Sequence, residues 1–335
     1  MNSVGTSEMR QLYDRIGSLL EIYDKWILVV HHRPDGDTLG CASAFASLGS
    51  DLGKNVSWYG KDPVPDNYQF LANVSRYKKV SGSDPVDNAL IIVLDTSNVE
   101  RSITQIDQSC NNKNEVINID HHGDNSLYGT VNLVDGSASS TGEMIWNFFK
   151  YQGYRISQNM AEALYVAVMT DTGNFSYGNT TSDVLTAAGE LAKHGARPCY
   201  LYERVYNNQS LEALKLWGRA FAHAEYLLPG VILAWLDKKD FKETGAFAKD
   251  TENLVSRILE VKDAVFSILI VEEEKASRCS FRACDNAINA QEIASIFGGG
   301  GHKQASGCVM DLQLSDALKE IREKVKDYVE RNSSC

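Results

Sequence analysis

The sequence has no long apolar run, and this absence excludes an ordinary membrane-spanning helix. No uninterrupted apolar stretch in the 335 residues approaches the roughly 18 residues that such a helix needs. The first residues, MNSVGTSEMRQLYDRI, also lack the apolar core of a secretory signal. We therefore expect a cytoplasmic protein with no membrane partner. Because 43% of the residues are hydrophobic, we also expect a folded chain rather than a disordered one.

Paired cysteines and an excess of basic residues are missing as well. The seven cysteines are scattered and form no C-x-x-C pair, which argues against a disulfide framework and against a thiolate zinc site. The 33 basic residues are outnumbered by 44 acidic ones, so the net charge is -11. Proteins that bind duplex DNA usually present a basic surface, and we expect no duplex DNA partner. A small anionic substrate is still compatible, since metal ions or local arginines can reverse the charge within a site.

The first half of the chain alternates short apolar runs with helical patterns, which is typical of a parallel sheet covered by helices. Buried strands are expected over 26–30, 89–94 and 116–119. Helices are expected over 42–52, 141–151, 160–169 and 181–194. The pattern Ser140-x-x-Glu143 is a capping box that would begin the second of these helices. These features predict an α/β fold with a doubly wound, mostly parallel sheet.

The second half has a different pattern and predicts a smaller α/β domain. Strands are expected over 231–236, 264–271 and 277–283. Helices are expected over 252–261, 290–297 and 314–329. The length suits two domains. We expect an N-terminal domain over 1–197, a helical linker over 198–224 and a C-terminal domain over 225–335.

Acidic and histidine side chains follow each of the three strands expected in the N-terminal domain. In chain order they are His31, Asp35 and Asp37, then Asp95, then Asp120, His121 and His122. Doubly wound sheets bind ligands at the carboxyl ends of their strands, so these groups are expected to share one crevice. Two carboxylates about 4 Å apart repel by roughly 4 kcal/mol at an effective dielectric constant of about 20. Divalent cations are the simplest way to offset this repulsion.

Asp171 adds a further acid at the C-terminal end of an apolar helix. Its charge there opposes the helix dipole by roughly 0.3–1 kcal/mol unless a cation lies nearby. The candidate ligands are then two imidazoles and four carboxylates: His31, His121, Asp35, Asp37, Asp95 and Asp171. A mixed nitrogen and oxygen set suits manganese or a similar ion, and four carboxylates would balance two divalent cations.

Each of these segments also has a purely structural explanation. Pro34–Asp37 could be a turn with an aspartate helix cap, and taken alone this is the better explanation. Asp95–Asn98 has ordinary loop composition, and Asp171–Gly173 could simply end a helix. Adjacent histidines after an acid are harder to explain in this way. The coincidence of all four segments at strand or helix ends favours a metal centre.

These motifs resemble those of a known enzyme family. HHRPDGD at 31–37, LDT at 94–96, Asp-His-His at 120–122 and DTG at 171–173 are similar to the four motifs of the DHH phosphoesterase superfamily. GGGGHKQASG at 298–307 resembles the C-terminal substrate-binding domain associated with that family. The two-domain layout is most similar to the bacterial nanoRNase and pAp phosphatase group.

The resemblance implies a role for each motif residue. It implies one ion held by His31, Asp35 and Asp95, and a second held by Asp37, Asp95, His121 and Asp171. It further implies that Asp120 orients an imidazole and that His122 faces the substrate phosphate or the leaving group. The expected catalytic residues are thus Asp95, Asp120 and His122. Cys41 departs from the serine that many relatives carry after the glycine of the first motif, which puts a phosphate contact there in doubt.

The expected strand over 277–283 carries residues suited to binding phosphate. Arg278, Ser280 and Arg282 alternate with apolar residues, so the strand would present both guanidinium groups on one face. A planar guanidinium can bind a phosphate through two hydrogen bonds. Alternatively, these arginines lie on a solvated face.

A run of glycines follows in the same domain. Gly299, Gly300 and Gly301 would allow backbone N–H groups to approach an anion, and His302 would be a further donor. Alternatively, the glycines only end a helix. Together with the resemblance, these residues predict a substrate-binding surface in the C-terminal domain.

The sequence therefore predicts a phosphoesterase that uses two divalent metal ions, most favourably manganese. Its expected substrates are short single-stranded RNA (nanoRNA) and 3′-phosphoadenosine 5′-phosphate, held in a cleft between the two domains. One alternative is a phosphodiesterase for cyclic or linear dinucleotides. Another is a non-catalytic nucleotide sensor, although the full set of six ligands counts against it. A homodimer is compatible with the sequence.

Overall fold

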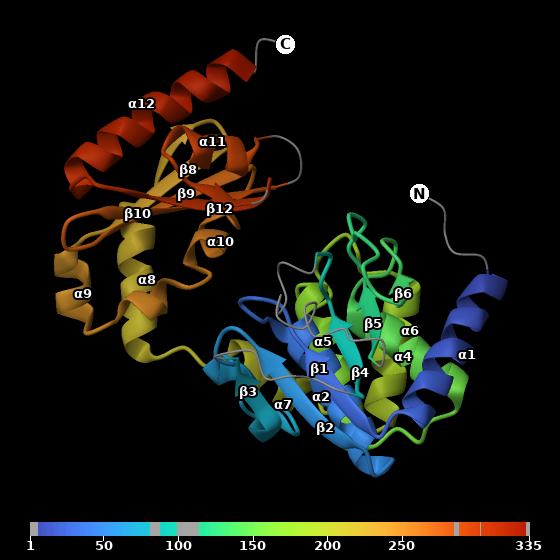
Figure 1. Cartoon of the computed structure of the whole chain (residues 1–335). Helices are drawn as coiled ribbons and strands as arrows, with labels where there is room; N and C mark the ends of the chain where they lie inside the picture. Colours follow the sequence, from blue (N-terminus) through green and yellow to red (C-terminus); the bar gives the residue numbers. More distant parts are fainter. Residues whose placement is uncertain (1–5, 81–87, 99–113, 285–287, 302, 333–335) are drawn as a thin grey trace. The chain divides into compact units, whose positions relative to one another are not determined.

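The computed structural model describes residues 6–80, 88–98, 114–284, 288–301 and 303–332. The chain divides into two compact units, Met1–Asn208 and Gln209–Cys335, and each unit contains its own sheet (Figure 1). In the described part of the chain, no helix combines the length and the apolar character needed to cross a membrane.

In the described residues, the first unit contains a six-stranded parallel sheet in the order β3-β2-β1-β4-β5-β6. The strands are β1 (Lys25–Val29), β2 (Asn55–Gly60), β3 (Tyr77–Lys79), β4 (Leu90–Leu94), β5 (Glu115–Asp120) and β6 (Val131–Val134). The chain order reverses between the neighbouring strands β1 and β4. This parallel α/β arrangement confirms the predicted fold class, and its reversal is the point at which such sheets bind ligands.

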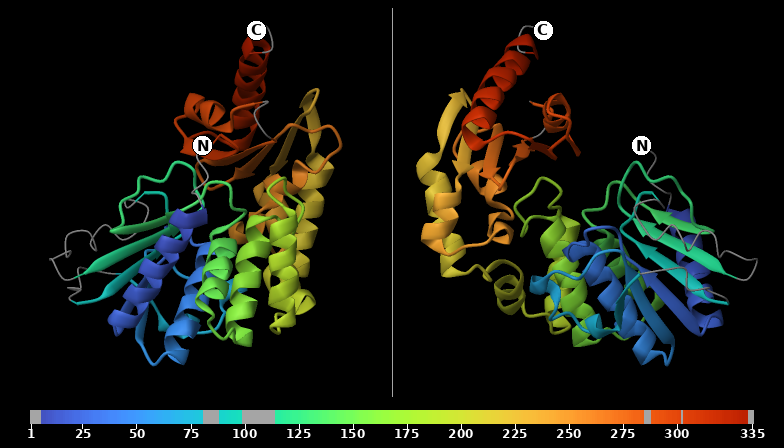
Figure 2. Two further views of the ribbon diagram at one scale, coloured as in Figure 1. Left: turned by 90° about the vertical axis from the view of Figure 1, so that its right-hand side faces the viewer. Right: turned by 60° about the vertical axis from the view of Figure 1, so that its left-hand side comes forward.

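The described helices of the first unit contribute to a core on one face of the sheet (Figure 2). They are α1 (Thr6–Ile22), α2 (Gly36–Asp51), α4 (Thr141–Gln152), α5 (Gln158–Asp171), α6 (Ser182–Lys193) and α7 (Pro198–Tyr206), with the 3-10 turns η1 (Asp66–Tyr68) and η2 (Val74–Arg76). Alternate strand residues such as Trp26 and Leu28 join this core. The residues between them, such as Ile27 and Val29, belong to a smaller apolar cluster on the opposite face.

Side-chain caps fix where the helices at the reversal point begin. The carboxylate of Asp35 accepts two backbone N–H groups from the first turn of α2, so this helix starts at Gly36, ahead of the predicted residue 42. Ser140 caps α4 as predicted, because its hydroxyl accepts the N–H of Glu143. The other half of the predicted capping box is wrong, since Glu143 accepts the N–H of Ser139 rather than that of Ser140.

The second unit is a mixed sheet with helices packed on both faces. In the described residues, the strand order is β11-β12-β10-β9-β8-β7, with β8 and β9 parallel and the other neighbours antiparallel. The strands are β7 (Glu225–Leu228), β8 (Val231–Leu236), β9 (Phe266–Glu272), β10 (Ser277–Ala283), β11 (Gly300–Gly301) and β12 (Ala305–Met310). The helices are α8 (Leu211–His223), α9 (Lys238–Thr244), η4 (Ala248–Thr251), α10 (Leu254–Ile258), α11 (Ala290–Ile296) and α12 (Leu314–Asn332). Residues of α11 and α12 join one core, and residues of α8 and α10 join another.

The segment expected to be a linker, 198–224, consists of two helices. α7 belongs to the first unit and α8 to the second, and the chain divides between Asn208 and Gln209. Ser210 then caps α8 by accepting the N–H of Ala213. Each half of this segment is therefore part of one of the two units.

Candidate metal centre

The predicted metal ligands lie together at the reversal point of the first sheet. His31 follows β1, Asp95 follows β4 and His121 follows β5, and these three strands are neighbours that run in the same direction. The two aspartates of the first motif lie at the start of α2, and Asp171 is the last residue of α5. Among the residues that the structure describes, three groups of side chains are close enough to hold a metal ion, and all three lie here.

The first group consists of His31, Asp35 and Asp95. Nδ1 of His31 lies 2.8 Å from the carbonyl oxygen of His32, and it must donate because a carbonyl only accepts. This bond leaves Nε2 of His31 without a proton when the ring is neutral. Nε2 lies 3.6 Å from Oδ1 of Asp35 and 3.5 Å from Oδ2 of Asp95. A histidine held through one nitrogen and open at the other is the usual form of a metal ligand.

The second group consists of Asp37, His121 and Asp171. Nε2 of His121 lies 4.0 Å from Oδ2 of Asp37 and 3.4 Å from Oδ2 of Asp171. The same nitrogen lies 3.5 Å from Oδ1 of Asp95, whose other oxygen is the one near His31. Asp95 therefore presents one carboxylate oxygen to each group.

The N-terminus of α4 binds two of these aspartates, a contact that sequence reasoning missed. The N–H of Thr141 donates to Oδ2 of Asp37 over 2.8 Å, and the N–H of Gly142 donates to Oδ1 over 2.9 Å. The hydroxyl of Thr141 donates to Oδ1 of Asp95 over 3.2 Å. A side chain at position 142 would collide with α5, because its Cβ would lie 2.5 Å from that of Ala167. A helix N-terminus favours negative charge, so α4 offsets part of the cost of burying Asp37.

Asp95 itself is held in an unusual backbone conformation. Its φ angle is 56°, in the left-handed region that residues other than glycine rarely adopt. The N–H of Asp95 donates to the carbonyl of Ile119 in the neighbouring strand over 2.9 Å, while Thr141 contacts its carboxylate from α4. Only 4% of the residue is exposed. Its orientation is therefore determined by two other elements, which is typical of strained residues at functional sites.

His122 and Asp120 form a hydrogen-bonded pair at the end of β5. Nδ1 of His122 lies 2.7 Å from Oδ1 of Asp120, and this bond raises the pKa of His122 to about 9. The other oxygen of Asp120 accepts a hydrogen bond from the side-chain amide of Asn125 over 2.6 Å. The same amide also donates to the side-chain oxygen of Asn118. Burial alone would raise the pKa of Asp120, but its hydrogen bonds keep that pKa below the usual range. Asp120 therefore stays ionised and orients His122 through Nδ1. Asn118 and Asn125 were not predicted.

The charges of the centre favour a bound cation. Burial and the charges of Asp95 and Asp171 raise the pKa of Asp37 well above its usual range. Burial raises the pKa of Asp171 to about 7, with His121 opposing this rise and Asp95 adding to it. Burial and the charge of Asp37 also raise the pKa of Cys41, whose thiol donates to Oδ1 of Asp37 over 3.4 Å. Protons would compete for these carboxylates unless divalent ions supplied the charge, and the facing imidazole nitrogens and carboxylate oxygens fit such ions.

The fold and this cluster define an α/β protein of two units with a candidate metal centre. Residues 26–168 match the model described as DHH family, N-terminal domain, and residues 229–331 match the DHHA1 domain. The chain therefore belongs to the DHH family of phosphoesterases, which are metal-dependent hydrolases of phosphate esters. The family predicted from the four motifs is confirmed.

Relatives and one solved structure match nearly the whole chain. It is 28% identical over 309 residues to the bifunctional oligoribonuclease and PAP phosphatase NrnA of Thermus thermophilus, covering 91% of this chain and 90% of that protein. It is 30% identical over 289 residues to the probable bifunctional oligoribonuclease and PAP phosphatase NrnA of Streptococcus mutans, covering 86% of this chain and 90% of that protein. The crystal structure of an exopolyphosphatase-related protein from Bacteroides fragilis has the same fold, with a TM-score of 0.84 and 24% identity. The match covers 96% of this chain and 98% of that protein.

In the second unit, Arg278, Ser280 and Arg282 lie on one face of β10, as expected from their alternation with buried residues. Arg278 is already engaged, because Nη2 donates to the hydroxyl of Thr251 over 2.8 Å and Nε lies 3.4 Å from Oε1 of Glu273. Arg282 has no carboxylate partner among the described residues. Its Nη1 donates to the carbonyl oxygen of Phe281 over 2.9 Å, and burial lowers its pKa. Arg282 is therefore the better placed of the two arginines to bind an anion.

The glycine run ends α11 and then forms a short edge strand. Gly300 and Gly301 pair with β12 as β11, at the edge of the described sheet. Gly299 has no room for a side chain, because its Cβ would lie 2.2 Å from the carbonyl oxygen of Gly307. His302, the other predicted substrate-binding residue of this segment, lies outside the described residues.

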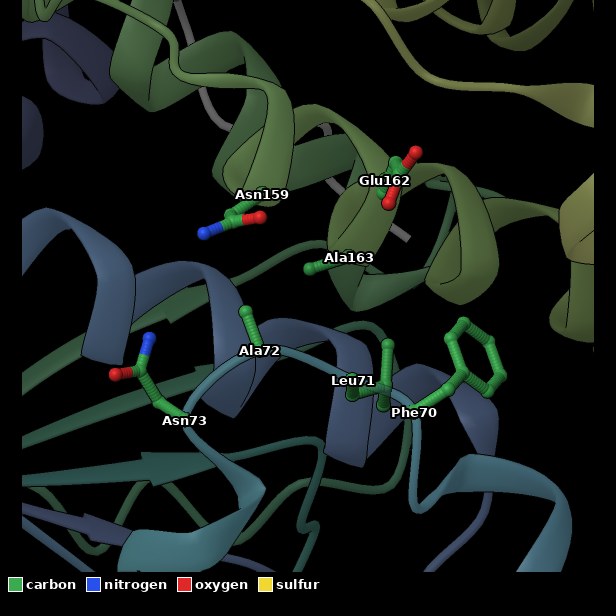
Figure 3. A pocket seen from close by; sticks show the side chains of 7 residues that line it. All are labelled: Phe70, Leu71, Ala72, Asn73, Asn159, Glu162 and Ala163. Atoms are coloured by element: carbon green, nitrogen blue, oxygen red, sulfur yellow. The ribbon is translucent and has the colours of Figure 1, made fainter.

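A separate cavity of about 360 Å³ lies between α5 and the segment 70–73 (Figure 3). Its lining includes Asn73 from that segment, and Asn159 and Glu162 from α5. None of the site residues predicted from the sequence lines it, so it is not part of the candidate metal centre.

Proposed function

We propose that this chain hydrolyses short oligoribonucleotides and 3′-phosphoadenosine 5′-phosphate at the centre around Asp95, with two divalent cations. The observation that carries the proposal is the placement of the two oxygens of Asp95, one 3.5 Å from Nε2 of His31 and the other 3.5 Å from Nε2 of His121. The names of relatives that cover both units give the substrate classes. The mixed nitrogen and oxygen donors favour manganese.

The ligands divide into two sets in this proposal. His31, Asp35 and Asp95 would hold one ion, and Asp37, Asp95, His121 and Asp171 would hold the other. When bound, the two ions would supply the Lewis acidity that activates a water and offsets the charge of the phosphate ester. The backbone N–H groups of α4 keep the carboxylate of Asp37 in a fixed orientation.

His122 would act on the leaving oxygen. Asp120 accepts the Nδ1–H of His122, so the proton on Nε2 of the charged imidazole can pass to that oxygen. The pKa of about 9 keeps His122 charged at neutral pH before this transfer. Asp120 would then stabilise and orient the ring without itself contacting the phosphate.

The second unit would contribute recognition of the nucleotide. Arg278, Ser280 and Arg282 present polar groups on one face of β10, and a guanidinium can bind a phosphate through two hydrogen bonds. The glycine segment 299–301 and His302 are proposed to add donors to the same phosphate. The substrate would then be a ligand with a terminal phosphate, such as a dinucleotide or a nucleoside bisphosphate.

A comparison of initial rates tests the proposal. The substrates are 5′-labelled dinucleotide RNA, 3′-phosphoadenosine 5′-phosphate, a cyclic dinucleotide and pyrophosphate, at one manganese concentration. We expect turnover of the first two to exceed that of the others, and excess chelator to abolish it. Faster turnover of the cyclic dinucleotide would overturn the substrate assignment. Saturable binding with no product from any of them would identify a nucleotide sensor instead.

A further inference from the structure

Three side chains donate hydrogen bonds to one buried carbonyl group, which follows Asp95 directly in the chain. The carbonyl oxygen of Thr96 accepts the side-chain amide of Asn118 over 3.2 Å and that of Asn125 over 3.2 Å. It also accepts the hydroxyl of Tyr128 over 2.9 Å. Both Thr96 and Asn118 are fully buried. A carbonyl oxygen has two lone pairs, so three donors use its whole accepting capacity and fix its position.

The three donors are also bonded to one another. Nδ2 of Asn118 donates to the hydroxyl of Tyr128 over 2.9 Å, and Oδ1 of Asn118 accepts the amide of Asn125 over 2.8 Å. The amide of Asn125 further donates to Oδ2 of Asp120 over 2.6 Å. Each amide nitrogen faces a backbone carbonyl, which only accepts, so the orientation of both amides follows from their partners. Because its members satisfy one another, this buried network is rigid.

The network joins the ends of two neighbouring strands that carry the candidate ligands. Asn118 lies in β5, while Asn125 and Tyr128 belong to the segment that follows this strand. The same segment is bonded to the residues that follow β4 at a second point, because Ser126 donates its N–H over 2.9 Å and its hydroxyl over 3.2 Å to the carbonyl of Ser97. The segment after β5 therefore holds the segment after β4 in place.

The left-handed backbone of Asp95 is what this network constrains. On one side of the residue, its own N–H is bonded to Ile119, and on the other side the carbonyl of Thr96 is held by the three donors. A residue with a φ of 56° keeps that conformation only when its surroundings impose it. We propose that Asn118 and Tyr128 are positioning residues, which hold Asp95 in this conformation through the carbonyl that they share. This role rests on the metal centre of the proposed function, because the carboxylate so directed is the one shared by both candidate metal groups.

Calorimetric titration of the metal-free, full-length chain with manganese tests this role without any turnover. Tyr128→Phe keeps the ring and removes one donor, and it should weaken manganese binding about three- to tenfold. Asn118→Leu keeps a similar volume and removes the bonds to the carbonyl and to Tyr128, and it should weaken binding about 10- to 100-fold. Tyr151→Phe is the matched control, because it removes a hydroxyl that bonds Asp14 on the exposed surface of the same unit, and it should keep the wild-type affinity.

Steady-state kinetics on dinucleotide RNA at saturating manganese give a second measurement. We expect kcat of Tyr128→Phe to fall about three- to tenfold while KM stays within about twofold of the wild-type value. The reason for this split is that the hydroxyl bonds only groups of the protein, so its removal should change the geometry of the centre rather than the binding of substrate.

Two results would overturn the proposal. One is wild-type manganese affinity and wild-type kcat in both variants. The other is a loss confined to the midpoint of denaturant unfolding, which a merely structural network would produce. If Asn118→Leu does not fold, Tyr128→Phe alone decides between these outcomes. If the wild type binds manganese but hydrolyses neither proposed substrate, the proposed function fails, whereas the manganese affinities of the wild type and Tyr128→Phe still decide the positioning role.

Discussion

Asp95 presents one oxygen to His31 and the other to His121, so removing its carboxylate disrupts both candidate metal groups at once. We expect Asp95→Ala to lower turnover of dinucleotide RNA and of 3′-phosphoadenosine 5′-phosphate by about 10³-fold or more. The reason is that bound metal ions supply several kcal/mol of transition-state stabilisation. The measurement is the initial rate at saturating manganese. Asp51→Ala, at the exposed C-terminal end of α2, is the control and should keep wild-type rates. Wild-type turnover by Asp95→Ala would contradict the shared role of Asp95.

Arg282 is the arginine of β10 that has no carboxylate partner among the described residues. We expect Arg282→Ala to raise KM for dinucleotide RNA about tenfold or more with a small change in kcat, because a charge-assisted contact to a remote phosphate contributes mainly to binding. Steady-state kinetics of the variant measure both constants. Arg331→Ala changes an exposed arginine that pairs with Asp327 on α12, and its KM should equal that of the wild type. A fall in kcat alone would assign Arg282 to the chemical step instead.

At the scale of single residues, the sequence predicted those site residues whose side-chain chemistry points to metal binding. Aspartates and histidines after successive strands, with Asp171 at the end of a helix, predicted six candidate ligands, and the structure places these side chains together. It did not predict Thr141 and Gly142, which act through backbone N–H groups that any residue carries. Their contacts reach Asp37 across more than a hundred residues of chain, and only the packing of α4 beside α2 reveals them.

At the scale of the element, long or strongly apolar segments were predicted well. The bounds of β8 and β10 agree with the prediction, β4 differs from it by one residue at its start, and β1 and β5 differ by one residue at each end. The strands β2, β6 and β12 were not predicted, because their sequences alternate apolar with polar or small residues. Pairing with neighbouring strands, rather than their own composition, makes these segments strands.

The approach of β12 to the glycine run leaves no room for a side chain at Gly299. A Cβ at Gly299 would lie 2.2 Å from the carbonyl oxygen of Gly307, whereas one at Gly300 would meet nothing within 4 Å. We expect Gly299→Ala to destabilise the second unit by about 1–3 kcal/mol, as overpacking does, and to raise KM for nucleotide substrates. Gly300→Ala is the matched control and should change stability by less than about 0.5 kcal/mol. Denaturant unfolding of both variants measures the difference, and equal midpoints would show that β11 does not depend on this contact.

At the scale of the whole molecule, the two units have separate apolar cores. One core joins the described helices of the first unit, while two others lie on the faces of the second sheet. The predicted metal ligands all belong to the first unit. Metal binding should therefore stabilise one unit directly and leave the intrinsic stability of the other unchanged.

Removal of the metal tests this separation. A ligand at about 100 times its Kd stabilises the folded state by about 2.7 kcal/mol. In a unit of this size each kcal/mol shifts Tm by about 2–4 °C, so excess chelator should lower the Tm of the first unit by about 5–10 °C. The repelling carboxylates around Asp95 are the physical reason, because bound cations would offset their mutual repulsion. Differential scanning calorimetry with and without manganese resolves the transitions, and Asp95→Asn should show a much smaller shift than the wild type. An equal shift of both units, or none in the first, would place the stabilising metal outside this centre.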